Sequence, residues 1–149
     1  MLDLYVRNRD FLAPYDPVRG DDFFTVEAQR VRIAEPGRHS WLILDEGEPA
    51  GFVGLSNVVR GPLQSAVLSY WVDGGHNGRG LCTAAVAEVV EHAFGELDLH
   101  RLEAGTLVDN VASQRVLEKN GFRRYGLAQR FLLIGGEWRD HVLFERTAD

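Results

Sequence analysis

Cysteine is nearly absent from this chain, and the single Cys82 excludes an internal disulfide and suits a reducing compartment. No apolar run approaches the roughly 20 residues that a membrane-spanning helix needs, and the first residues lack a secretory signal. The five histidines show no H-E-x-x-H or similar spacing, so no metal site is expected. Basic residues are outnumbered, 16 against 22 acidic ones, which argues against nucleic acid as a partner. These absences favour a cytoplasmic protein without membrane or nucleic-acid partners.

What remains is the composition of an ordinary globular domain. The chain has 149 residues, of which 45% are hydrophobic and 26% charged. A chain of this length buries about two-thirds of its unfolded surface, which is enough for one core without disulfides. No repeat, low-complexity tract or linker divides it. We therefore expect residues 1–149 to form a single domain.

The hydrophobic period changes after three predicted strands. Residues 41–44, 49–59 and 64–72 carry strand signals, and Gly51 and Gly54 in the second strand indicate bulges or close backbone approach. Before them, residues 11–17 form a proline-fixed loop and residues 21–34 a loosely amphipathic helix.

Helical spacing then follows. Residues 81–97 place Val86, Val89 and Val90 on one face, and residues 102–108 return to a strand. A helix over residues 110–120 is bounded by Asn110, a good N-cap, and Gly121, a good C′ residue, with Val116 and Leu117 facing inward. Two closing strands flank Gly135 and Gly136. A meander followed by alternating helices and strands predicts a mixed α/β sheet of the α+β type with helices on both faces.

The strongest chemical signal is N-G-R-G-L-C, which runs from Asn77 to Cys82 between a strand and a helix start. Glycines allow a tight turn with exposed N–H groups, and the helix N-terminus adds partial positive charge. This arrangement suits a pyrophosphate, and Arg79 could contact a phosphate directly. It is neither a P-loop nor the G-x-G-x-x-G fingerprint.

A second motif, N-V-A-S-Q-R-V-L-E-K-N-G-F, begins at Asn110, about thirty residues later. In that order, the two motifs resemble the GNAT superfamily of N-acetyltransferases, in particular the RimJ and RimL branch that acetylates ribosomal-protein N-termini. The likeness runs from about Trp41 to Phe144. It implies a GNAT fold with a mostly antiparallel sheet, acetyl-CoA as acetyl donor and an amine as acceptor.

The resemblance also implies roles for individual residues. Asn110 would hydrogen-bond the pantetheine arm, and Ser113 would lie near the sulfur and protonate the departing thiolate. The splayed strand that pairs with pantetheine and fixes the thioester carbonyl would lie at Trp71 and Val72. The pyrophosphate would be held by Asn77, Gly78, Arg79, Gly80, Leu81, Cys82 and Thr83.

Three positions depart from the family pattern. Asn77 stands where the loop usually opens with Gln or Arg. Val67 stands where relatives often place a glutamate base, so the base is unassigned among Asp16, Asp73, His76, Glu103 and Tyr125. The first strand is missing, and the chain begins inside the first helix, whose end would be residues 5–11. Alternation of Leu2, Leu4 and Val6 leaves a short replacement strand as the alternative, and a homodimer could cover the open edge.

Several functions therefore stay open. The leading one is direct transfer of an acetyl group to a primary amine, with a protein N-terminal α-amine first because its pKa of about 8 makes a strong base unnecessary. A small-molecule amine (antibiotic, polyamine or amino-acid-like) is the alternative. A non-catalytic acetyl-CoA-binding module is the third. Cys82 is expected to be a small packing residue beside the loop and not a nucleophile.

Overall fold

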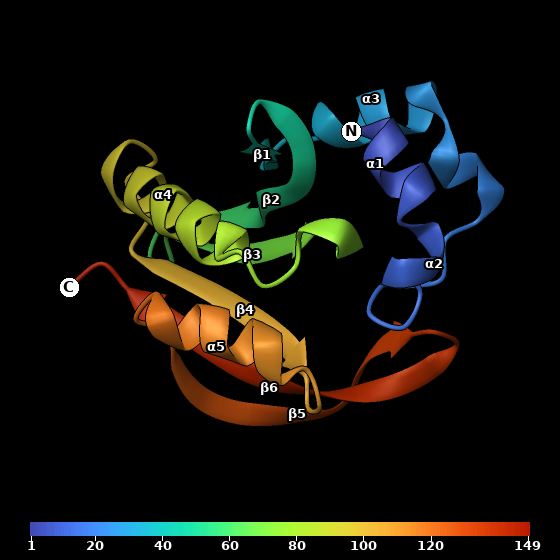
Figure 1. The fold of residues 1–149 in the computed structure, drawn as a ribbon. Helices are drawn as coiled ribbons and strands as arrows, with labels where there is room; N and C mark the ends of the chain where they lie inside the picture. The colour runs from blue at the N-terminus through green and yellow to red at the C-terminus, as the bar shows by residue number, and fades with distance from the viewer.

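The sheet has six strands in the order β1-β2-β3-β4-β6-β5, in a computed structural model that describes all of residues 1–149 (Figure 1). Every neighbouring pair is antiparallel except β3 and β4, which run parallel. The predicted mostly antiparallel sheet is therefore confirmed. The strands are β1 (His39–Asp45), β2 (Glu48–Val59), β3 (Ser65–Val72), β4 (Arg101–Leu107), β5 (Arg123–Ile134) and β6 (Glu137–Thr147).

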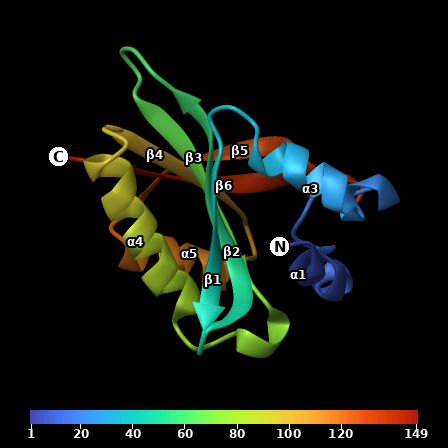
Figure 2. The ribbon, with the colours of Figure 1, turned by 90° about the horizontal axis from the view of Figure 1, so that it is seen from above.

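Helices cover both faces of the sheet, as predicted. Figure 2 shows α4 and α5 on one side of the strands and α1 and α3 on the other. None of the helices is both long and apolar enough to span a membrane. The helical segments are α1 (Leu2–Arg7), α2 (Arg9–Leu12), the 3-10 turn η1 (Asp21–Phe24), α3 (Val26–Ile33), the 3-10 turn η2 (Gly74–His76), α4 (Leu81–Gly95) and α5 (Val111–Lys119).

The main core lies between α4, α5 and the sheet. Val86 and Val90 of α4 and Leu117 of α5 are almost fully buried against strand residues such as Leu102 and Phe144. Burial of side chains of this kind stabilises by about 1.5–3 kcal/mol each. The helical period predicted for both segments is thus the one that packs them on the sheet.

The predicted single helix over residues 21–34 is wrong. Thr25 has an extended backbone (φ −123°, ψ 153°) that separates η1 from α3. Its hydroxyl oxygen accepts a hydrogen bond from the backbone N–H of Ala28 at 3.2 Å. Threonine is a favoured N-cap because its side chain satisfies an N–H that the first turn leaves free, so the helix begins after it.

The N-terminal residues form two short helices and no strand. The alternative of a replacement strand over Leu2, Leu4 and Val6 is wrong, because Leu4 and Tyr5 are instead buried from one face of α1. No strand lies outside β1, which forms one edge of the sheet. The close approach expected at Gly51 is confirmed: a Cβ there would lie 2.4 Å from the Trp71 carbonyl oxygen.

Candidate functional site

Strands β3 and β4 separate soon after they begin. They pair only where residues 65–67 face residues 101–103, so β3 beyond Val67 has no partner on that side. Backbone N–H and C=O groups in this opening are free to bind another extended chain. Residues on both sides of the opening line a cleft together with Asn110 and Ser113 of the second sequence motif.

A cleft of about 340 Å³ occupies this part of the molecule. Its lining joins segments that are far apart in sequence: the N-terminal helices and proline loop, α3, β2, β3, β4, α5 and one residue of β6. The polar and aromatic side chains of the lining include Tyr5, Tyr15, Asp16, Arg19, Arg32, Arg38, Tyr70, Trp71, Asn110, Ser113 and His141. The structure therefore brings Asn110, Ser113 and Trp71 together in one lining, whereas Val72 and residues 77–83 do not line it.

The loop from Asn77 to the first turn of α4 presents a run of free donors. No carbonyl or side chain of the protein accepts a hydrogen bond from the backbone N–H groups of residues 77–83. Gly78 and Gly80 have φ values of +76° and +75°, a conformation that side chains other than glycine rarely adopt. With the partial positive charge of the helix N-terminus, these N–H groups form a site for an anion such as a pyrophosphate.

Arg79 does not point freely toward such an anion. Its guanidinium forms an ion pair with Asp45 at the end of β1. His76 Nε2 lies 3.7 Å from the same carboxylate, and its Nδ1 is 4.0 Å from Asp73. Burial opposes ionisation of Asp73, but hydrogen bonds from the Gly75 N–H and Arg7 hold its pKa below the usual range. This charged cluster fixes the loop against β1.

Ser113 lies beside Tyr70, which the sequence marks only as part of the predicted strand over residues 64–72. The Tyr70 hydroxyl is 2.8 Å from Ser113 Oγ and donates to the Ser113 carbonyl at 2.9 Å. Burial raises the pKa of Tyr70 well above its ordinary value, so its phenol keeps its proton. Asn110 caps α5, since its Oδ1 accepts from the Ser113 N–H at 3.2 Å. Its amide nitrogen stays available for a ligand.

Cys82 follows the loop and does not behave as an activated thiol. Burial raises its pKa to about 11, so the thiol is protonated at neutral pH. A helix start can lower a thiol pKa, but here desolvation dominates. This environment agrees with the packing role predicted for Cys82.

Comparison with known proteins agrees with this geometry. The family model described as an acetyltransferase (GNAT) domain matches residues 5–123. The chain is 42% identical to the probable N-acetyltransferase YjcK of Bacillus subtilis (strain 168), a match that covers 94% of this chain and 82% of that protein. The chain belongs to the GNAT acetyltransferase family.

This acetyltransferase also resembles enzymes whose acceptors are named. It is 32% identical to the [ribosomal protein uS5]-alanine N-acetyltransferase of Escherichia coli (strain K12), over 99% of this chain and 80% of that protein. The structure of the corresponding S5-alanine acetyltransferase of Vibrio fischeri superposes with a TM-score of 0.91 at 31% identity, covering 99% of this chain and 86% of that one. The structure of Mycobacterium smegmatis RimJ in complex with CoA-disulfide superposes with a TM-score of 0.89 at 32% identity, covering 99% of this chain and 75% of that one.

GNAT acetyltransferases use acetyl-CoA as donor, and the residues present here fit it. The free N–H groups of residues 77–83 match a pyrophosphate, and the gap beyond residue 67 of β3 matches an extended amide-containing arm. No group of three or more His, Cys, Asp or Glu side chains is placed to hold a metal ion.

The five residues weighed as a base do not lie together. Only Asp16 lines the cleft. Asp73 and His76 belong to the cluster beside the loop, whereas Glu103 accepts a hydrogen bond from Tyr125 at 2.9 Å outside the cleft. The Arg101 guanidinium, 2.8 Å away, holds the pKa of Glu103 below its usual range.

His141 is a lining residue that sequence reasoning missed. It is 4% exposed, and its Nδ1 lies 3.0 Å from the Arg139 carbonyl oxygen. That contact favours the tautomer with a proton on Nδ1, which leaves Nε2 as an acceptor. No spacing signal could have found it, because β6 comes beside β4 only through the strand order.

Proposed function

We propose that this acetyltransferase moves an acetyl group to a protein N-terminal α-amine. The observation that carries the proposal is that the cleft lining offers no carboxylate free of an ion pair, and the imidazole of His141 is the other group there that could accept a proton. Asp16 is the only carboxylate in the lining, and Arg19 lies 3.3 Å from it as an ion-pair partner. An α-amine, with a pKa of about 8, is partly neutral at pH 7, whereas a lysine amine near 10.4 depends on a base. Relatives named as alanine acetyltransferases of ribosomal protein S5 support the same choice.

The donor would be held by residues on both sides of the gap between β3 and β4. Acetyl-CoA supplies the acetyl group as an activated thioester. Its pyrophosphate would be bound by the backbone N–H groups of Asn77, Gly78, Gly80, Leu81, Cys82 and Thr83. The Arg79 side chain is instead paired with Asp45. Trp71 and Val72 would offer free backbone groups to the pantetheine and to the thioester carbonyl, and Asn110 its amide.

The chain's own residues then need to do little besides positioning and proton transfer. The neutral amine forms the new C–N bond as the C–S bond breaks, and the amine proton leaves to solvent or to Asp16. Ser113 gives its hydroxyl proton to the departing thiolate and regains a proton from solvent, while the Tyr70 hydroxyl, 2.8 Å away, holds the serine in place. Because burial keeps Tyr70 protonated, its contacts with Ser113 persist throughout the neutral range.

A small amino-acid-like amine is the second candidate, favoured by the modest volume of the cleft, about 340 Å³. One of the matching proteins is the L-amino acid N-acetyltransferase AaaT of Escherichia coli (strain K12), 29% identical over 78% of this chain. An antibiotic or polyamine acceptor has no such support from the lining.

The experiment compares acetyl-CoA-dependent thiol release with three versions of one peptide. The first has a free N-terminus and no lysine. The second has a blocked N-terminus and an internal lysine, and the third has a free N-terminus and an internal lysine. We expect turnover with the first and third only. Efficient acetylation of the second peptide with none of the first would overturn the α-amine proposal.

A further inference from the structure

Arg32, on α3, faces the cleft with a guanidinium that is surrounded mainly by aromatic rings. Its Cζ lies 5.3 Å from the ring centre of Tyr5, 5.4 Å from that of Phe23 and 5.7 Å from that of Phe52. Its one hydrogen bond runs from Nη1 to the Tyr5 hydroxyl at 2.6 Å. The rings hold the charged head in a fixed place at the edge of the cavity.

The other arginines of this region differ from Arg32 in one respect. Arg19 and Arg38 also line the cleft, but Arg19 lies 3.3 Å from Asp16 and Arg38 2.8 Å from Glu35. No carboxylate lies within ion-pair distance of Arg32. A partly buried charge without a counter-ion is costly, and a guanidinium is shaped to bind a carboxylate through two parallel hydrogen bonds.

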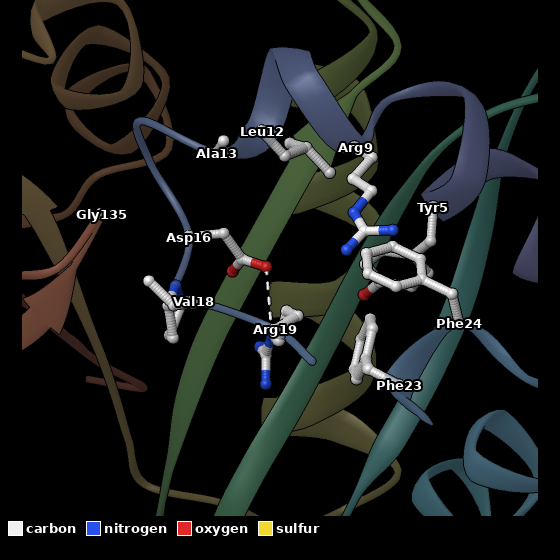
Figure 3. A pocket seen from close by; sticks show the side chains of 11 residues that line it. Tyr5, Arg9, Leu12, Ala13, Asp16, Val18, Arg19, Phe23, Phe24 and Gly135 are labelled. Carbon is white, nitrogen blue, oxygen red and sulfur yellow. Dashed lines mark hydrogen bonds and ion pairs between the residues drawn. The ribbon is translucent and has the colours of Figure 1, made fainter. Parts of the chain in front are cut away.

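Even the neighbouring stacked arginines have acidic partners. In the adjoining pocket of about 320 Å³, Arg9 lies over the ring of Phe24 and Arg19 over that of Phe23 (Figure 3). Arg9 is bound to Asp21 at 2.7 Å. Stacking on an aromatic ring therefore does not by itself explain why Arg32 lacks an acid.

The charge of the cleft is the reverse of the charge of the protein. The chain carries a net charge of −6, yet the cleft lining has three arginines and a single carboxylate, Asp16. All three arginines come from the segment between α2 and β1, on the opposite face of the sheet from α4 and α5. A polycationic acceptor would meet repulsion there, whereas an anionic group would find an unpaired partner.

We propose that Arg32 is a specificity-determining residue that binds a carboxylate of the acceptor. The inference rests on the proposed function and adds a second recognition point to the amine. The carboxylate is a binding group only and takes no part in the transfer. It could be the side chain of an acidic residue just after the N-terminus of a peptide, or the α-carboxylate of a free amino acid.

The experiment measures kcat/KM for two matched pairs of acceptors. The first pair is a peptide that begins Ala-Asp and the same peptide beginning Ala-Asn, and the second is alanine and alaninamide. We expect the carboxylate form to be preferred about tenfold or more in one of the pairs, because a charge-assisted bidentate contact is lost with the amide. The pair that shows the preference identifies the source of the carboxylate.

Variants then assign the preference to Arg32. Arg32→Gln should bring the two members of the responding pair to within about twofold, and Arg32→Lys should keep part of the preference. Arg30→Gln, on the exposed side of the same helix, is the matched control and should keep it all. An acetyl-CoA-dependent rise in melting temperature shows that each variant is folded. If Arg32→Gln is not folded, the Arg32→Lys variant decides. A reduced preference for the carboxylate in Arg32→Lys supports the role of Arg32, and an unchanged preference overturns it.

The outcomes separate the two proposals. Equal rates within both pairs, or a preference that survives Arg32→Gln, would overturn the role of Arg32 and leave α-amine acetylation standing. Turnover with lysine amines and none with any of these four acceptors would instead overturn the proposed function.

Discussion

The hydroxyl groups of Tyr70 and Ser113 lie 2.8 Å apart, although 43 residues separate them in the chain. Tyr70 is on β3 and Ser113 in the first turn of α5, so the contact spans the gap where β3 and β4 diverge. Ser113, the residue proposed to protonate the leaving thiolate, thus has a protonated hydroxyl as its partner.

Removing the two hydroxyls one at a time should separate proton donation by Ser113 from the positioning of Ser113 by Tyr70. Ser113→Ala should lower kcat by about 10²-fold, in the range typical of a lost general acid. Tyr70→Phe should lower kcat about tenfold and cost about 1 kcal/mol of stability for the lost hydrogen bond. Steady-state kinetics with acetyl-CoA varied checks both, and the KM for acetyl-CoA should change little. A wild-type kcat in Ser113→Ala would refute the role of its hydroxyl.

Gly80 and Gly95 mark the two ends of α4 and make a matched pair. A Cβ at either position would meet nothing within 4 Å, but only Gly80 has a positive φ, +75°. Gly80→Ala should therefore cost about 1 kcal/mol through backbone strain and weaken acetyl-CoA binding. Gly95→Ala, in helical conformation, should raise stability by about 0.5–1 kcal/mol.

Thermal unfolding with and without acetyl-CoA measures both effects. At a concentration 100 times Kd, the ligand should add about 2.7 kcal/mol to the wild type. That increment should shrink in Gly80→Ala and stay unchanged in Gly95→Ala. Equal increments in the two variants would show that the loop conformation does not matter for the donor.

Glu145 lies between Arg101 and Arg123 and is only 6% exposed. Its removal costs its ion pairs with two guanidinium groups, but Arg101 keeps Glu103 and Arg123 is 78% exposed, so Glu145→Ala should cost about 1.5–3 kcal/mol. Glu103, at 35% side-chain exposure, also binds Arg101, and Glu103→Ala should cost about 1 kcal/mol or less. Urea unfolding of both variants tests this order, which equal losses would contradict.

Alkaline pH should destabilise the fold through Cys82. Its pKa is raised from 9.0 to about 11 by burial, so between these values the unfolded thiol ionises while the folded one keeps its proton. The unfolded state then binds fewer protons, and stability falls as pH rises from about 9 to 11. Tyr70, raised for the same reason, adds to the loss at the upper end. The free energy of unfolding should fall less steeply in Cys82→Ala, and a parallel decline would exclude Cys82 as a cause.

The sequence by itself determined what depends on neighbouring residues. The loop from Asn77 to Cys82, the cap at Asn110 and the turn at Gly135 and Gly136 are fixed by local backbone preferences, and each lies where the pattern predicted. The same local logic failed at residue 25, because Thr25 fits a helical pattern and an N-cap equally well and the cap prevailed.

Only the tertiary structure decided which side chains share the cleft. Tyr70 meets Ser113, Arg32 meets Tyr5, and His141 lies beside β4 because β6 is inserted between β4 and β5 in the sheet. Strand order and the early separation of β3 from β4 come from packing over the whole chain, and no local period encodes them. The loop from Asn77 to Cys82 could thus be read from the sequence, whereas the lining of the cleft could not.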